Sequence, residues 1–299
     1  MKIILLGFNS FTGSSISEYF GSKPGVVLTH VGRQESALHQ VVKFEVPNDI
    51  SMLEQSVRNL VKQLSLDDSI IINCISMGDV DKCEVEKNSC KIQNHLFVEA
   101  LYRNIKKSKF KKLIHFSTNA VYDGNNAPYK EISDCFPVNF YGLTKLKADQ
   151  FLLGQKDPRL MLIRPITMYG KVPEGGRPNP VSMIIERLKN NQPLTLVDDV
   201  LVNILYVGDL VRAINQLIEM DFKGLINISG DEVYSRYELG LKIAKLIGSK
   251  EDLISSATST EFETIANRPM NTSFDNTLMK SMRIETHKLK QVISKLYEC

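Results

Sequence analysis

Short apolar runs alternate with longer amphipathic stretches along the first half of the chain. Five runs have the length of a strand, at residues 2–7, 26–32, 69–75, 112–117 and 160–165. Apolar residues at successive positions are typical of strands covered on both faces, and the stretches between them are long enough for crossover helices. The pattern therefore predicts a doubly wound α/β fold, in which helices cover both faces of a parallel sheet.

The pattern changes after Arg164 and Pro165. A loop rich in Gly and Pro at residues 171–180 precedes a helix-like segment, and two further helix patterns follow toward the C-terminus. Loops of this kind are common where a chain leaves one packed unit for another. We expect a nucleotide-binding domain at residues 1–165, to which the chain returns at 203–228. A smaller, mainly helical substrate lobe would comprise residues 166–202 and 229–299.

Composition narrows the function classes only slightly. The 299 residues are 43% hydrophobic and 24% charged with a net charge of +3, which is typical of a globular protein and not of a disordered one. The five lysines within residues 106–112 could bind nucleic acid, but with one aromatic residue among them a solvated helix end is the preferred interpretation. We expect neither a nucleic-acid partner nor a membrane partner.

The cysteines and the N-terminus indicate a cytoplasmic protein. The five cysteines form no CxxC pair and have no histidines at zinc-binding spacing, so we expect reduced thiols and no metal site. The apolar N-terminal run is too short for a signal sequence or a membrane span.

A glycine turn follows the first predicted strand, in the sequence GFNSFTG. Such a turn opens a helix whose free N–H groups can bind a pyrophosphate, and its place at the start of a βαβ series favours a Rossmann-type dinucleotide site. A serine stands where a middle glycine is usual. We expect this turn to contribute to cofactor binding through Gly7, Ser10, Phe11, Thr12 and Gly13.

The residues after the second predicted strand bear on the choice of cofactor. Gly32, Arg33 and Gln34 contain no carboxylate where an acid would hold the hydroxyls of the adenosine ribose. The Arg33 guanidinium could instead bind a 2′-phosphate, so NADPH is favoured and NADH is the alternative. The less favoured alternative is that Arg33 is a surface residue of a turn, and Glu35 is close enough to oppose a phosphate.

A tyrosine and a lysine stand four residues apart in the segment YGLTK. On a helix, Tyr141 and Lys145 share one face, so the ammonium group could lower the pKa of the phenol and prepare it for proton transfer at a carbonyl. Thr118, at the end of the fourth predicted strand, could hydrogen-bond the same oxygen. Together with the glycine turn, these residues predict a nicotinamide-dependent oxidoreductase.

These segments resemble the extended short-chain dehydrogenases/reductases, and within them the dTDP-4-dehydrorhamnose reductase branch. The resemblance covers essentially the whole chain, and the similar segments are residues 73–84, 117–124, 128–131, 137–145 and 267–271. It implies that Thr118, Tyr141 and Lys145 form a catalytic triad with Tyr141 as general acid. It also implies that Lys145 binds the nicotinamide ribose. The residues implied to line the diphosphate and nicotinamide side of the cofactor are Asn73, Cys74, Ile75 and Ser76.

The substrate side departs from the branch. Asn119 and Ala120 replace an aspartate and a tyrosine that contact sugar in the branch, and the branch's tryptophan after the arginine strand is absent here. We expect substrate contacts from Ser117, Asn119 and Arg268, although Arg268 could equally form a structural ion pair. The chemistry therefore resembles the branch, while recognition of the sugar differs.

Three other polar groups have simpler interpretations. Glu131 could bind magnesium or another subunit, but a solvated loop carboxylate is preferred. His115, within a predicted strand, is expected to be packed in the core. The adjacent Asp198 and Asp199 fit a turn before a strand without a metal ion.

The leading hypothesis is a reductase of a 4-keto-6-deoxy sugar nucleotide. The alternatives are an NAD-dependent sugar-nucleotide epimerase and a non-catalytic regulatory subunit that senses cofactor. The expected partner is a sugar nucleotide, and assembly as a homodimer stays open. The sequence identifies neither the base nor the sugar.

Overall fold

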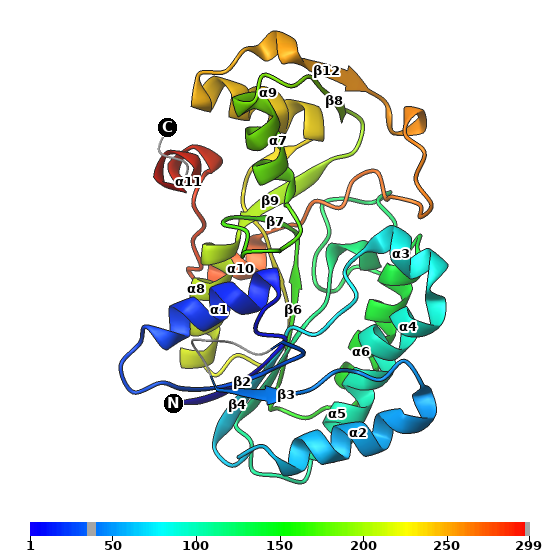
Figure 1. Ribbon diagram of the computed structural model, residues 1–299, viewed down its shortest axis with the longest axis vertical. Coiled ribbons are helices and arrows are strands. Elements are labelled where there is room, and N and C mark those ends of the chain that lie inside the picture. Colours follow the sequence, from blue (N-terminus) through cyan, green and yellow to red (C-terminus); the bar gives the residue numbers. More distant parts are fainter. Residues whose placement is uncertain (35–39, 297–299) are drawn as a thin grey trace.

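A seven-stranded parallel sheet forms the centre of the computed structural model, which describes residues 1–34 and 40–296 (Figure 1). The strand order is β10-β6-β5-β4-β1-β2-β3, so the chain first builds one half of the sheet and then crosses to build the other. The strands are β1 (Lys2–Leu6), β2 (Val27–Gly32), β3 (Val41–Lys43), β4 (Ser69–Asn73), β5 (Lys112–Phe116), β6 (Leu160–Pro165) and β10 (Gly224–Ile228). This arrangement confirms the predicted doubly wound α/β fold.

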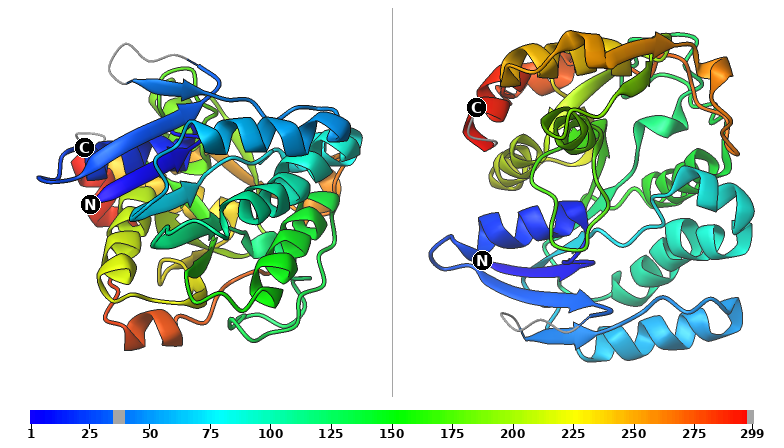
Figure 2. Two further views of the ribbon diagram at one scale, coloured as in Figure 1. Left: turned by 90° about the horizontal axis from the view of Figure 1, so that it is seen from below. Right: turned by 45° about the horizontal axis from the view of Figure 1, so that its top comes forward.

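Successive side chains of the strands supply two different cores. In β1, Ile3 and Leu5 belong to the core on one face of the sheet, whereas Ile4 and Leu6 belong to the core on the other face. Helices α1 (Phe11–Gly21) and α8 (Val207–Glu219) cover the first face. The second face is covered by α2 (Ile50–Lys62), α5 (Phe97–Ile105) and α6 (Phe140–Gly154) (Figure 2). Burial on both faces explains why the strands are apolar at nearly every position.

Shorter helices connect the second half of the sheet. Between β4 and α5 lie α3 (Val80–Val85), α4 (Lys87–Lys91) and a π-helical turn (Ile92–Leu96), and a 3-10 turn (Asn119–Val121) follows β5. The lysines at residues 106–112 are interpreted from the sequence as a solvated helix end. This holds for four of the five, whose side chains are exposed next to the end of α5. Lys112 differs: it is buried in β5, and its Nζ donates 2.7 Å hydrogen bonds to Asp221 and to the Phe222 carbonyl.

A third hydrophobic core lies above the sheet and contains two small sheets as well as helices (Figure 1). One sheet pairs β7 (Thr167–Tyr169), β9 (Val202–Tyr206) and β11 (Val233–Tyr234), and the other pairs β8 (Leu194–Val197) with β12 (Ile254–Ala257). The helical elements of this part are α7 (Pro180–Lys189), α9 (Arg236–Ile247), α11 (Leu289–Leu296) and two 3-10 turns (Glu251–Leu253 and Ser259–Glu261). The helix α10 (Thr277–Ser281) packs against β10 instead. The small sheets were not anticipated from the hydrophobic pattern.

The structure also bears on the expectations for the cysteines and for a membrane span. Four of the cysteines are free thiols, and the fifth, Cys299, lies outside the described residues. No helix in the described part of the chain combines the length and the apolar character that crossing a bilayer requires.

Candidate active site

The glycine turn after β1 brings the start of α1 close to the sheet. Gly7 has a φ of +77°, which an L side chain rarely adopts, and a Cβ at Gly13 would lie 2.2 Å from the Gly7 carbonyl oxygen. Ser10 is the N-cap of α1: its hydroxyl donates to the Gly7 carbonyl (2.8 Å) and accepts from the Gly13 N–H (3.1 Å). The serine thus stabilises the same tight turn for which a third glycine is usual.

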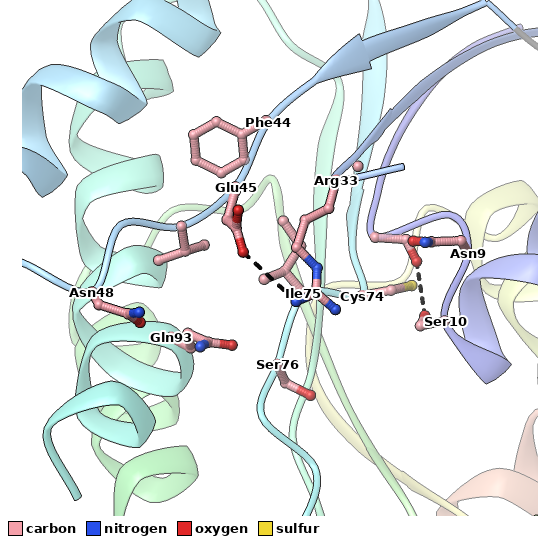
Figure 3. Close-up of a pocket in the computed structure, with 13 residues that line it drawn as sticks. Asn9, Ser10, Arg33, Phe44, Glu45, Asn48, Cys74, Ile75, Ser76 and Gln93 are labelled. Atoms are coloured by element: carbon pink, nitrogen blue, oxygen red, sulfur yellow. Dashed lines mark hydrogen bonds and ion pairs between the residues drawn. The ribbon is translucent and has the colours of Figure 1, made fainter. Parts of the chain in front are cut away.

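A cavity of about 170 Å³ lies beside this turn at the carboxyl ends of the strands (Figure 3). Arg33 follows β2 and reaches across the cavity, where its Nη1 lies 3.7 Å from an oxygen of Glu45. Both side chains are about 70% exposed, so this ion pair is weak. The sequence interpretation missed Glu45, which lies two residues after the short edge strand β3. Glu35 lies outside the described residues.

Most of the predicted cofactor residues line this cavity or the adjoining one of about 300 Å³. Cys74, Ile75 and Ser76 line both cavities and so connect them. Phe11 and Gly13 line neither; Gly13 acts through the close packing of the turn. The other predicted residues divide between the first cavity, with Gly7, Ser10 and Arg33, and the second, with Thr12, Asn73, Tyr141 and Lys145.

Asn73 shapes the loop that joins the two cavities. It is buried at the end of β4, and its Oδ1 accepts a 3.1 Å hydrogen bond from the Ile75 N–H. Its Nδ2 lies 3.3 Å from Nδ1 of His115 on β5. His115 is 1% exposed, and burial holds its pKa well below the usual value, so the ring is neutral. The predicted core histidine is confirmed, and it holds Asn73 in place.

Close backbone packing brings Thr118 and Tyr141 to the same cavity wall. Thr118 caps the 3-10 turn after β5 by accepting from the Ala120 N–H (3.1 Å). The helix α6 begins with Asn139 as N-cap, and Tyr141 lies in its first turn. A Cβ at Gly142 would lie 2.1 Å from the Ala120 carbonyl oxygen, so only glycine permits this approach. Thr118, Tyr141 and Lys145 all line the cavity of about 300 Å³.

Burial controls the ionisation of the tyrosine and the lysine. It raises the pKa of Tyr141 to about 12, although the neighbouring Thr118 hydroxyl lowers it in part. Burial lowers the pKa of Lys145 to about 8, and its Nζ donates a hydrogen bond to the Phe116 carbonyl. The expected lowering of the tyrosine pKa by the lysine is therefore not seen. Loss of hydration outweighs the hydrogen bond with Thr118 at Tyr141, which stays protonated at neutral pH.

A buried ion pair lies behind Lys145. The Asp149 carboxylate accepts 3.0 Å hydrogen bonds from Nε and Nη2 of Arg164 on β6, and a 2.7 Å hydrogen bond from the Ser117 hydroxyl. Asp149 also raises the pKa of Lys145 through its charge, although burial has the larger effect. The hydroxyl of Ser117 is therefore engaged with the core, and its contact with substrate stays a prediction.

A larger cavity of about 690 Å³ extends from Thr118 and Tyr141 toward the third core. Asn119 lines it and donates a 2.7 Å hydrogen bond from Nδ2 to the Thr272 hydroxyl. Arg268 lines it too and pairs with Asp81 at 2.8 Å, so a structural ion pair and a place in the cavity coexist. Both predicted substrate residues therefore lie on the side of the catalytic groups away from the glycine turn.

The remaining candidates have structural roles. Glu131 accepts a 2.9 Å hydrogen bond from the Asn227 N–H, which ties its loop to β10. Asp199 accepts hydrogen bonds of 2.9 Å from the N–H and the hydroxyl of Ser259, within a turn between β8 and β9.

Comparison with known proteins agrees with this geometry. The chain is 26% identical over 243 residues to a dTDP-4-dehydrorhamnose reductase from Aggregatibacter actinomycetemcomitans, covering 77% of this chain and 81% of that protein. It is 25% identical over 228 residues to methionine adenosyltransferase 2 subunit beta from Danio rerio, covering 74% and 68% of the two chains. A crystal structure of Bacillus anthracis dTDP-4-dehydrorhamnose reductase in complex with NADP superimposes with a TM-score of 0.81 at 21% identity, covering 99% and 98%.

The profile of one protein family spans nearly the whole sequence. It is described as the RmlD substrate binding domain, and it matches residues 1–298. The chain therefore belongs to the RmlD substrate-binding domain family.

Proposed function

We propose that this protein is an NADPH-dependent reductase of a 4-keto-6-deoxy sugar nucleotide. The observation that supports it best is that Thr118, Tyr141 and Lys145 all line the cavity of about 300 Å³, which shares lining residues both with the cavity beside the glycine turn and with the larger cavity. A cofactor on one side and a keto sugar on the other would meet at these three side chains. Relatedness to dTDP-4-dehydrorhamnose reductases supports the same chemistry.

The residues around the first two cavities fit a nicotinamide dinucleotide. The close packing at Gly7 and Gly13 leaves room for a pyrophosphate at the start of α1, and Arg33 offers a cation for a 2′-phosphate. Glu45 is the opposing group, because its carboxylate repels a phosphate and attracts ribose hydroxyls. The proposal is that NADPH is preferred and that NADH also binds. When bound, the cofactor supplies the hydride.

Side chains of the protein would donate the proton and orient the carbonyl group of the substrate. Tyr141, whose pKa is raised, is protonated at neutral pH and can donate its phenolic proton to the alkoxide oxygen as the carbonyl is reduced. Thr118 can hold the same oxygen. Lys145 lines the same cavity as Tyr141, so it can contact the ribose and its charge can stabilise the phenolate that remains after proton transfer.

We also propose the division into a nucleotide-binding domain, residues 1–165 and 203–228, and a substrate lobe, residues 166–202 and 229–299. Support comes from the third core, to which α7, α9, α11 and the small sheets contribute and the central sheet does not. The strand β9 lies at the boundary and contributes side chains to the first core as well as to the third. The large cavity has walls from both parts, so the sugar nucleotide would bind between them.

The test is NADPH oxidation against a panel of 4-keto sugar nucleotides that differ in base and sugar. We expect turnover of at least one compound and poor turnover of dTDP-4-dehydrorhamnose, because Asn119 and Ala120 remove sugar contacts expected in the rhamnose-forming branch. Purified protein that carries NAD and never consumes added NADPH would indicate the epimerase instead.

A regulatory subunit is the second candidate, because the chain is also similar to methionine adenosyltransferase 2 subunit beta. A regulatory subunit would bind cofactor and leave every keto sugar unchanged. Retention of Thr118, Tyr141 and Lys145 together at one cavity wall supports the reductase over this alternative.

A further inference from the structure

Arg236 differs from the other arginines that line the cavities of the substrate side. It is the first residue of α9 and lines both the cavity of about 690 Å³ and an adjoining one of about 510 Å³. Its Nη1 is buried and has no hydrogen-bond partner. Within residues 1–34 and 40–296, no carboxylate forms an ion pair with it, and burial alone lowers its pKa to about 10. The side chain is still a cation at neutral pH.

Arg177 and Arg268 provide the contrast. Each pairs with an aspartate at the start of α3: Arg177 with Asp79 at 2.9 Å and Arg268 with Asp81 at 2.8 Å. The carboxylate nearest to Arg236 in sequence, Glu238, accepts from the Ser235 N–H in the capping box of α9. The side chain as a whole is partly exposed, but its Nη1 is buried without a partner or counter-charge. This reduces stability, so an anionic ligand would supply the missing partner.

The three cavities adjoin one another, since Thr167 lines all of them, and the ligand can be placed with respect to their other lining residues. Thr118 and Tyr141 line the cavities of about 300 and 690 Å³ but not that of about 510 Å³. Arg236 and Arg268 line the last two. Arg236 therefore lies further along these cavities from the catalytic groups, where the group attached to a bound sugar would extend. Beyond it, the cavity is lined by the partly exposed Phe262 and Met183, which suit the flat face of a base.

We propose that Arg236 binds the diphosphate of the sugar nucleotide, with Arg268 as a second cation on the same wall. The inference rests on the proposed function for the identity of the ligand. A guanidinium presents a planar fork of N–H donors that matches phosphate oxygens, so the unpartnered Nη1 would gain a charge-assisted hydrogen bond on binding. The sugar would then lie between this contact and the hydroxyls of Thr118 and Tyr141.

The test is calorimetric titration of UDP and dTDP, with uridine and thymidine as probes that lack phosphate. In wild type we expect the diphosphates to bind at least tenfold more tightly than their nucleosides. Arg236→Met should weaken diphosphate binding about tenfold to a hundredfold, leave NADPH binding unchanged and raise Tm, because a buried unpaired charge is removed. Arg187→Met, an exposed arginine on α7 outside these cavities, is the matched control and should change neither affinity nor Tm.

Arg236→Lys keeps the charge and loses the planar fork, and it should weaken diphosphate binding about threefold to tenfold. It also decides the matter if Arg236→Met fails to fold. Diphosphate affinity within twofold of wild type in a folded Arg236 variant overturns the proposal, and so does a wild type that binds diphosphates no better than nucleosides. These outcomes are separate from failure of the reductase function, which would show as tight diphosphate binding without NADPH oxidation.

Discussion

The cofactor side and the substrate side of the active site are built in different ways. The cofactor side consists of loops that leave the carboxyl ends of β1, β2, β3 and β4, which are neighbours in one sheet. The substrate side gathers residues from β7, the start of α9 and the segment 259–272. The ends of neighbouring strands hold the cofactor loops at a fixed spacing. The substrate side is assembled from separate segments, so one of its residues can be substituted without moving the others. We therefore expect mutations to change cofactor binding and substrate specificity separately.

Tyr141→Phe should lower turnover without changing cofactor affinity, and we expect the largest effect from it. It removes only the phenolic proton donor, so turnover should fall by about 10²–10⁴ while NADPH affinity stays the same. Steady-state kinetics on the best keto sugar, with cofactor binding measured separately, provides the check. Tyr19→Phe on α1 is the control and should have no effect. Near wild-type turnover of Tyr141→Phe would remove the catalytic assignment.

Lys145→Ala should affect both sides, because its proposed role is to contact the nicotinamide ribose and to act together with Tyr141, which lines the same cavity. We expect turnover to fall by at least about a hundredfold and NADPH binding to weaken as well. In the double variant with Tyr141→Phe the losses in turnover should be far from additive, since the two groups act as a unit. Lys147→Ala, exposed two residues further along α6, is the control. Full additivity would mean that the two residues act independently.

The pH dependence should report Lys145. Burial lowers its pKa to about 8, so the ammonium group is present below this pH and is lost as the pH rises through it. Tyr141, with a pKa of about 12, stays protonated over the same range. We therefore expect kcat/KM to be level below pH 8 and to fall up to tenfold per pH unit above it. A profile that is flat from pH 6 to 10 would contradict the assignment.

Arg33→Asp should affect the cofactor side alone and have the smallest effect of the four. Loss of the cation and gain of a carboxylate should shift the ratio of NADH to NADPH affinity about tenfold toward NADH. Glu45→Gln is the opposite variant: it removes the repelling carboxylate and should favour NADPH. Fluorescence titration of both cofactors measures the ratio. If neither variant changes it, Arg33 is only a turn residue.

The sequence predicted the sheet and much of the site because both depend on local patterns. The five apolar runs correspond to β1, β2, β4, β5 and β6, and the motifs around Gly7 and Tyr141 follow strands or begin helices. The edge strand β3 is only three residues long and half-exposed, so its pattern was too weak to predict.

Groups that act through space were harder to predict than the local motifs. Glu45 lies near Arg33 only because β2 and β3 are neighbours in the sheet. The lack of a hydrogen-bond partner for Nη1 of Arg236 depends on how distant segments pack around it, which the sequence does not reveal. The raised pKa of Tyr141 likewise follows from the depth of burial at the start of α6, which spacing along a helix does not reveal.

The placement of Arg33 and Glu45 has a consequence for how the protein can evolve. Both follow the last two strands at one edge of the sheet, and both side chains point into solvent. A substitution at either position changes no core packing and therefore costs little stability. With the cofactor contacts proposed for Arg33 and Glu45, single surface mutations would shift the preference between the two nicotinamide cofactors. Substitutions at the start of α6 are far more restricted, because a Cβ at Gly142 would lie 2.1 Å from the Ala120 carbonyl oxygen.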